Sequence, residues 1–329
     1  MKRGCFLSLI VLFGTILLLP PAGFAAENTL RIATGSRLGT YHHIAEDIAK
    51  IVQPHGVSVE VIDSLGSLEN VDMLKRGTAD LAIVQSDVIG VLHKVDPEIV
   101  ENIRVVFPLY LEEVHLLAKK GIHSLYDLSR KKVATGIERS GNAITMSVVL
   151  YKTIVPGVKK IEDMGPKDAV TALLTGDIDA MVYVAGKPVD LFKRLETMKG
   201  DPKYSAMVEK LHFLPIESDK LLQEYYTKTT LTPADYQWMD QPVPTIAVRA
   251  LLVKRQTGEI DAADEKKKGC DQRLVKLVDT VRREFDTLKK TGHPKWEKVD
   301  LDAPLTSPWE YAPCVDCGVD AKTIKSMFD

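Results

Sequence analysis

Strand-like and helix-like segments alternate from residue 30 onward, and this order limits the folds open to the chain. Residues 30–33 read as a strand, and residues 41–52 as a helix whose apolar residues recur every four positions. A second strand and helix follow over 57–76, and a buried strand over 80–84. This βαβαβ order is typical of α/β proteins, in which helices cover both faces of a mostly parallel sheet.

The same order returns in the second half of the chain. A strand and a helix are predicted over 132–152, and a helix and a strand over 167–184. LKRGTADLAIV (74–84) and LLTGDIDAMVY (173–183) share a helix end, a glycine, an aspartate and a buried strand, although so short a pattern also arises by chance. We therefore expect two lobes, each with its own sheet.

Two apolar segments, 114–118 and 246–253, read as strands that join the lobes. If the chain leaves the first lobe at one of them and returns at the other, that lobe is discontinuous. We therefore predict lobe I from residues 26–119 plus 246–329, with an irregular C-terminal tail, and lobe II from residues 120–245.

The N-terminus has the order of a secretory signal peptide. Two basic residues precede an apolar run over 5–19, and a proline pair ends that run before small residues near Ala25. The run is shorter than a comfortable bilayer span, so we expect a cleaved signal over residues 1–25 rather than a retained anchor. The mature protein is then expected to be soluble in the periplasm.

The charge balance argues against some partners. The chain has 43 basic and 45 acidic residues, and loss of the signal leaves a net charge of about −4. A nucleic-acid-binding domain would be expected to be basic, so no such partner is predicted. No later segment has the continuous apolar length of a membrane span, so we expect contact with the membrane only through a partner.

Three cysteines, Cys270, Cys314 and Cys317, remain after the signal. A redox pair at Cys314 and Cys317 would need a helix N-terminus to lower the thiolate pKa, and here the pair follows Pro313 in an irregular tail. A structural disulfide, within that pair or from Cys270 to one of its members, is the favoured interpretation. A zinc site is a weaker one.

Five segments, taken in their order along the chain, resemble one known family. They are TGSRLGTYHHIAEDIAK, SLGSLENVDMLKRGTADLAIVQSD, SGNAITMSVVL, GDIDAMVYVAGKP and TIAVRALLVK. Together they resemble the TAXI-type solute receptors of tripartite ATP-independent periplasmic (TRAP) transporters over residues 30–254. The chain departs from that pattern at His42 and Ala45, and it has Asn142 where threonine is usual.

The resemblance implies a type II periplasmic-binding-protein fold, in which a hinge joins two α/β lobes that close on a small organic solute. It also implies delivery of the solute to the integral membrane subunits of a TRAP transporter that an ion gradient drives. No cofactor is implied. A periplasmic ligand-sensing module of a signalling receptor would have the same fold and is the alternative.

The glycine-spaced loop before the first helix is the first candidate binding segment. Gly35 lets an anionic group approach the unpaired N–H groups of the helix start, where Ser36 either binds the solute or merely caps the helix. Arg37 can hold a carboxylate, Tyr41 can stack on a solute, and His42 can donate a hydrogen bond to it. Solute contacts are predicted at these five positions.

Polar residues after predicted strands are the second group of candidates. Ser67, Gln85 and Ser86 follow the second and third strands, at the sheet edge where open α/β proteins bind ligands, although Ser67 could merely cap a helix. In lobe II the corresponding predicted contacts are Arg139, Ser140, Gly141, Asn142, Ala185 and Gly186. Arg139 could instead pair with its neighbour Glu138.

Neither an enzyme nor a metal site is predicted. Ser140 does not lie in a G-x-S-x-G motif, and no His or Asp motif nominates a partner for it. His42 and His43 point about 100° apart on a helix, and no second His or Cys cluster accompanies them. We expect a receptor that leaves its solute unchanged. An amino acid or a dicarboxylate fits the donors, and a neutral polar solute stays open.

Overall fold

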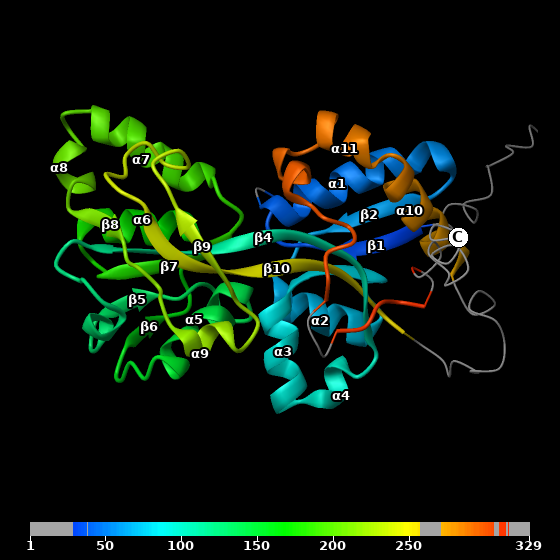
Figure 1. Ribbon diagram of the computed structural model, residues 1–329, viewed down its shortest axis with the longest axis horizontal. Helices are drawn as coiled ribbons and strands as arrows, with labels where there is room; N and C mark the ends of the chain where they lie inside the picture. The colour runs from blue at the N-terminus through cyan, green and yellow to red at the C-terminus, as the bar shows by residue number, and fades with distance from the viewer. Residues whose placement is uncertain (1–28, 38, 257–270, 306–308, 314, 316–329) are drawn as a thin grey trace, which may run out of the picture.

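The computed structural model describes residues 29–37, 39–256, 271–305, 309–313 and 315. The predicted signal peptide and the cysteines Cys270, Cys314 and Cys317 lie outside the described residues. Figure 1 shows two lobes side by side, with two long strands running from one into the other.

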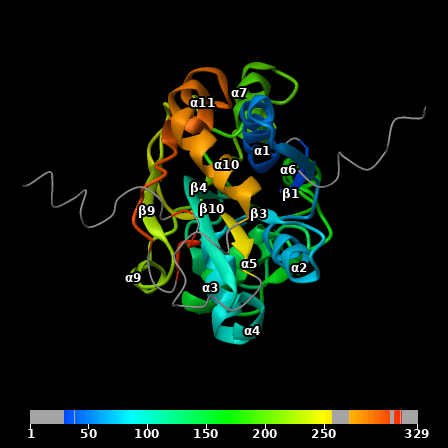
Figure 2. The same cartoon turned by 90° about the vertical axis from the view of Figure 1, so that its right-hand side faces the viewer.

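Lobe I is built from the N-terminal βαβαβ unit together with C-terminal helices. Its elements are β1 (Thr29–Ala33), α1 (Thr40–Val52), η1 (Gln53–His55), β2 (Ser58–Ile62), α2 (Ser67–Arg76), β3 (Leu81–Gln85), α3 (Ser86–Val95), α4 (Pro97–Val100), α10 (Gln272–Arg283), α11 (Phe285–Thr291) and η3 (Pro294–Lys298). The strand β1 pairs in parallel with β2 and β3, as predicted. Helix α10 lies beside α1 although the two are far apart in sequence (Figures 1 and 2).

Lobe II repeats the parallel arrangement, since β5 pairs in parallel with both β6 and β7. Its elements are η2 (Leu125–Leu128), β5 (Lys132–Ala134), α5 (Gly141–Lys152), β6 (Lys159–Ile161), α6 (Pro166–Thr175), β7 (Ala180–Ala185), α7 (Asp190–Gly200), α8 (Ser205–Val208), β8 (Leu211–Phe213), α9 (Asp219–Leu222) and β9 (Thr227–Leu231).

Two long strands, β4 (Ile103–Lys119) and β10 (Val243–Arg255), run through both lobes and contain the two apolar segments predicted to join them. They pair with each other antiparallel, while β10 also pairs with β3 of lobe I and β4 with β7 of lobe II. One ten-stranded sheet results, in the order β2-β1-β3-β10-β4-β7-β5-β6, with β8 and β9 off this path. The prediction of a separate sheet in each lobe is wrong, because β4 and β10 stay hydrogen-bonded where they pass between the lobes.

Each lobe has its own apolar core. In lobe I the residues Ile44, Ile48 and Val52, which carry the four-residue period of α1, are all fully buried. In lobe II, Met146 of α5 and Val133 of β5 are buried in the same way. Burial of each such side chain stabilises the fold by about 1.5–3 kcal/mol. Among the described residues, no helix is long and apolar enough to cross a membrane.

Candidate functional site

A cavity of about 230 Å³ lies between the two lobes. Lobe I lines it with Gly35, Ser36, Gly39, Thr40, Tyr41, Ser64, Leu65, Gly66, Ser67, Gln85 and Glu112, and lobe II with Ile137, Ser140, Gly141, Asn142, Pro166, Tyr183, Val184 and Ala185. The loops around Gly35 and Gly141 therefore face one shared site, although they are about a hundred residues apart in the chain.

Five helices begin at this cavity. The residues that precede α1, α2, α3 and α5 line it, namely Gly39, Gly66, Gln85 and Ser140, and so does Pro166, the first residue of α6. The first N–H groups of a helix have no partner within the helix, and the helix dipole places a partial positive charge there. The cavity therefore presents donors to an anionic group from both lobes.

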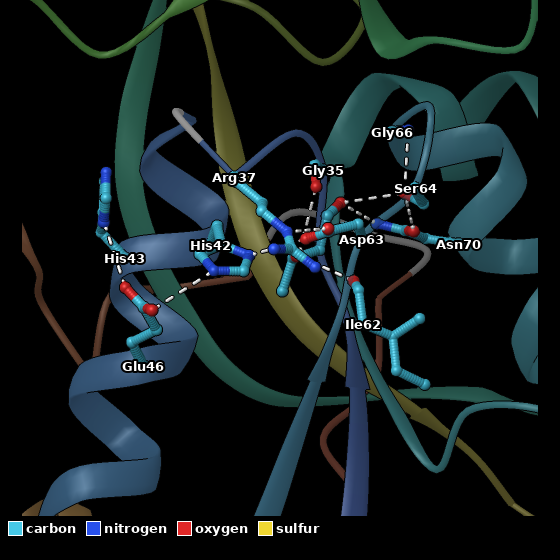
Figure 3. Close-up of polar contacts among 11 residues, drawn as sticks. Gly35, Arg37, His42, His43, Glu46, Ile62, Asp63, Ser64, Gly66 and Asn70 are labelled. Carbon is cyan, nitrogen blue, oxygen red and sulfur yellow. Dashed lines mark hydrogen bonds and ion pairs between the residues drawn. The ribbon is translucent and has the colours of Figure 1, made fainter.

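The end of β2 and the start of α2 hold the loop of lobe I in place (Figure 3). Ser64 donates its backbone N–H to the carbonyl of Gly35 at 3.3 Å and its hydroxyl to Asn70 Oδ1 at 2.6 Å. Asn70 is fully buried and donates to the carbonyls of Thr34 and Ile83, at 2.5 and 2.7 Å. This network joins the ends of β1 and β2 to the middle of β3.

The corresponding loop of lobe II is held by α5 and β7. Ser140 caps α5, because its hydroxyl accepts a hydrogen bond of 3.4 Å from the N–H of Ala143. Asn142 accepts a hydrogen bond of 2.8 Å from the N–H of Val184, at the end of β7. Ser140 also lines the cavity. The capping alternative considered for Ser36 and Ser67 is not seen, because Gly39 and Gly66 are the N-cap residues of α1 and α2 and neither helix has a side-chain cap hydrogen bond.

Glu112, on β4, is the only Asp, Glu, Lys, Arg or His among the described residues that line the cavity. It is 4 % exposed, and its Oε2 accepts a hydrogen bond of 2.6 Å from the hydroxyl of Tyr41. Burial raises the pKa of Glu112 to about 8, against the opposing effect of the Tyr41 hydrogen bond. No arginine, lysine or histidine is among the described residues that line the cavity.

Nine of the fourteen predicted contacts line the cavity: Gly35, Ser36, Tyr41, Ser67, Gln85, Ser140, Gly141, Asn142 and Ala185. The other five, which do not line it, are Arg37, His42, Ser86, Arg139 and Gly186. Ser86 is buried, and its hydroxyl accepts a hydrogen bond of 3.2 Å from the N–H of Arg249. Gly186 lies against Lys295, whose Cε would be 2.3 Å from a Cβ at that glycine.

Arg37 and His42 both point to Asp63 (Figure 3), and none of these three residues lines the cavity. Arg37 Nε donates to Asp63 Oδ2 at 2.5 Å, and the Arg37 side chain is 81 % exposed. The Arg37 hydrogen bond lowers the pKa of Asp63. His42 Nδ1 lies 3.0 Å from Asp63 Oδ1, and His42 Nε2 lies 3.3 Å from Glu46 Oε1. Arg37 therefore has a partner without a solute, whereas the buried His42 Nδ1 makes no hydrogen bond among the described residues despite its proximity to Asp63.

Arg139 forms an ion pair between the lobes instead of lining the cavity. Its Nη2 lies 3.0 Å from Asp72 Oδ2 on α2, and its φ of 69° lies in the left-handed region. The distant Asp72, rather than the adjacent Glu138, is therefore its partner. Both side chains are partly exposed, so the pair contributes at most about 1 kcal/mol.

The lobes touch each other beside the cavity. A Cβ at Gly141 would lie 1.6 Å from Gln85 Oε1, so the backbone of lobe II approaches a side chain of lobe I as closely as glycine allows. Gln85 is 3 % exposed, and its Oε1 has no hydrogen-bond partner among the described residues. The cavity is thus bounded by a close interlobe contact that includes an unsatisfied amide oxygen.

Sequence reasoning missed several lining residues. Gly66 directly precedes Ser67, the first residue of α2, so the sheet-edge argument could have included it. Glu112 and Tyr183 lie inside β4 and β7, where the apolar pattern indicates burial and gives no indication of a cavity.

A larger cavity of about 640 Å³ lies in lobe II, around β8 and the loop that contains Trp238 and Met239. All of its lining residues belong to lobe II, so closure of the lobes cannot enclose a ligand there. The interlobe cavity is the better candidate because polar groups and helix ends converge on it from both sides.

A family model described as the NMT1-like family matches residues 32–263. The chain belongs to the NMT1-like family. The match extends over both lobes and includes every residue that lines the interlobe cavity. The further prediction, that this NMT1-like protein is a TAXI-type receptor, stays a prediction.

Solved structures with a similar fold include Tv2483 bound to L-arginine, with a TM-score of 0.50 and 10% identity over 84% of this chain and 95% of that one. The substrate-binding protein of an amino acid ABC transporter has a TM-score of 0.44 and 14% identity, over 82% and 96%. A histidine kinase sensor domain with similarity to periplasmic binding proteins has a TM-score of 0.48 and 15% identity, over 82% and 96%.

At such low identity these similarities concern the fold alone. The similarity to Tv2483 and the sheet topology confirm the predicted fold class: the NMT1-like chain is a mixed α/β protein with two lobes.

Proposed function

We propose that this NMT1-like protein is an exported receptor that binds a small, carboxylate-bearing organic solute between its lobes. The observation that carries the proposal is the convergence of five helix N-termini and several hydroxyl groups on one cavity shared by both lobes. A helix N-terminus stabilises an anion by about 0.3–2 kcal/mol, so several of them acting together supply useful affinity.

Movement of the lobes is part of this proposal. The proposed units are those predicted from the sequence, 26–119 plus 246–329 and 120–245, with β4 and β10 bending between them. Because both lobes line the cavity and touch beside it, a solute enters most easily when they separate. Closure would then change the surface that the receptor offers to a partner.

The proposed partner is the membrane part of a TRAP transporter, and the proposed location is the periplasm after signal removal. Support comes from the five ordered segments that resemble TAXI-type receptors. The proposed role does not include catalysis. Among the described residues that line the cavity, no histidine, lysine or cysteine accompanies the serine hydroxyls as a base or nucleophile.

A binding screen tests the capture step. The mature chain is titrated by calorimetry with amino acids, dicarboxylates, 2-oxo acids and neutral polyols. We expect one class of carboxylate to bind with a Kd of about 1 μM or tighter, equivalent to about −8 kcal/mol, and to return chemically unchanged. Binding of polyols alone, or of no compound, contradicts the proposal, and a chemically altered solute contradicts the receptor role.

A reconstitution experiment tests delivery. Vesicles that contain the candidate TRAP membrane subunits should accumulate the labelled solute only when the receptor is added with an ion gradient. If the receptor instead co-purifies with a membrane-bound kinase and has no effect on uptake, it acts as a sensor module.

A further inference from the structure

Glu112 differs from the other residues that line the cavity. Its buried carboxyl group accepts a hydrogen bond, whereas the helix N-termini around it present N–H donors. It pairs with Val248 of β10 at the point where the two joining strands leave lobe I. Only 4 % of the residue is exposed, yet it lines the cavity. The surrounding helix N-termini favour a carboxylate of the ligand, whereas the Glu112 carboxylate repels one.

Only one oxygen of the Glu112 carboxyl group has a hydrogen-bond partner among the described residues. Tyr41 donates to Oε2 at 2.6 Å, and no other hydrogen bond to the Glu112 side chain is made within the part of the chain that the structure describes. The Nζ of Lys295 donates to the carbonyl of Lys187 rather than to Glu112. A buried carboxylate with one donor is costly, so free Glu112 keeps a proton near neutral pH unless a further donor arrives.

The ionisable groups around Glu112 come from several elements, namely Tyr41, Asp87, Tyr110, Glu113, Tyr183 and Lys295. Asp87 and Glu113 disfavour its charge, and Lys295 favours it. Gln85, also in lobe I, lines the same cavity, and its buried amide oxygen has no hydrogen-bond partner among the described residues. Two buried acceptors in a cavity of about 230 Å³ call for donors on the ligand.

We propose that Glu112 is a specificity-determining residue, whose carboxylate accepts a hydrogen bond from an ammonium group of the ligand while the helix N-termini hold the ligand's carboxylate. This inference rests on the proposed receptor function and deepens it. The proposed pairing favours binding of a zwitterion over binding of an acid of the same length that lacks the amine, because such an acid leaves Glu112 without a second donor.

A proton is released when such a ligand binds. Burial raises the pKa of free Glu112 to about 8, so at pH 7 most molecules carry the proton. An ammonium group beside the carboxyl favours its charged form, and the proton leaves to the buffer. Affinity for the zwitterion therefore rises with pH through the free-state pKa, whereas affinity for an acid without the amine falls.

The test uses matched probe pairs: L-glutamate with glutarate, and L-leucine with 4-methylpentanoate. Calorimetry in buffers of different ionisation enthalpy measures proton release by the wild-type protein. We expect the amino member of the preferred pair to bind at least tenfold tighter, with affinity rising about tenfold from pH 6.5 to 8.5. Proton uptake on binding, or affinity that falls over this range, overturns the inference without any variant.

Two substitutions provide the matched comparison. Glu112→Gln should reduce the preference for the amino member to less than about threefold and remove the pH dependence. Glu113→Gln alters the next residue, which accepts from the N–H of Lys187 at 2.7 Å and does not line the cavity. This variant should keep the preference for the amino member, and its pH dependence should persist but move to lower pH, because a charge that disfavours ionisation of Glu112 is removed. An undiminished preference in Glu112→Gln overturns the inference alone. If no probe binds the wild-type protein, both the inference and the carboxylate receptor proposal fail.

Discussion

Asp87 of lobe I and Thr145 of lobe II are joined by a hydrogen bond of 2.6 Å between fully buried side chains. The hydroxyl of Tyr226, also from lobe II, donates to the same Asp87 oxygen at 2.9 Å. The contact between the lobes therefore includes a buried carboxylate whose Oδ2 accepts from two hydroxyl groups of the opposite lobe, while its Oδ1 has no partner among the described residues. These hydrogen bonds join the two lobes with a defined geometry, in addition to apolar packing.

Replacement of Asp87 by alanine should reduce the free energy of unfolding by about 1–3 kcal/mol, because two buried hydroxyl groups lose their acceptor. Solute affinity should fall as well, because the contact joins the two lobes and the proposed opening movement would break it. Urea unfolding and calorimetry measure the two effects. Asp72→Ala is the control: it removes a partly exposed interlobe pair and should cost at most about 1 kcal/mol. Equal costs for the two variants would contradict this account.

The Glu112→Gln variant should differ from the wild type in how stability depends on pH. The folded pKa of Glu112 is about 8 against an ordinary value of 4.5, so between these pH values the folded protein keeps a proton that the unfolded chain releases. Raising the pH through this window therefore lowers the free energy of unfolding, by an amount on the order of a few kcal/mol.

Because glutamine does not titrate, the stability of the variant relative to the wild type should increase from pH 4.5 to 8. Urea unfolding at several pH values measures this difference. Asp127→Asn provides the opposite sign in a lower window: N–H groups of His123 and Ser124 lower the Asp127 pKa, and that stabilisation is lost as the pH falls below the ordinary value of 3.8, so this variant should show no change between pH 4.5 and 8. A difference for Glu112→Gln that does not change with pH would contradict the prediction.

Gly141→Ala should weaken solute binding by about tenfold or more while the protein still folds. The new Cβ would meet Gln85 Oε1 at 1.6 Å, so either Gln85 moves into the cavity or the lobes stay apart, at a stability cost of about 1–3 kcal/mol. Gly200→Ala is the matched control in the same lobe, because nothing lies within 4 Å of its Cβ position. Wild-type affinity in Gly141→Ala would show that the contact is not needed for binding.

Arg139→Ala should change solute affinity by no more than about fivefold at low salt, because it removes an exposed ion pair outside the cavity. The difference should vanish at about 1 M salt, where such pairs are screened. Calorimetry at two salt concentrations measures it. A large loss that persists at high salt would indicate that Arg139 contacts the solute directly, as the sequence alone suggested.

Much of the fold follows from local sequence. Ile44, Ile48 and Val52 recur every four positions, and α1 buries all three. Gly77 and Gly176 end α2 and α6 with positive φ, as expected of glycines at helix ends. The continuity of the sheet was missed, because a periodic pattern identifies a strand without identifying its neighbours.

The candidate site also contains some residues that the sequence predicts and others that it does not. Gly35, Ser67 and Ser140 were predicted from local rules about strand ends and helix starts, and all three line the cavity. A guanidinium group can hold a carboxylate, and for that reason the sequence predicts Arg37 and Arg139 as solute contacts. In the structure, Arg37 pairs with Asp63, 26 residues away, and Arg139 with Asp72, 67 residues away. Long side chains bind whichever acid the packing brings near, and no local pattern encodes that choice.

The sequence by itself determined the α/β class, the loops that end at the sheet edge and the glycines that let backbones approach each other. Only the tertiary structure decided that Glu112 lines the cavity with Tyr41 as its partner, 71 residues away in the chain. The physical reason is that secondary structure depends on interactions within a few residues. A cavity between two lobes depends instead on how distant strands and helices pack.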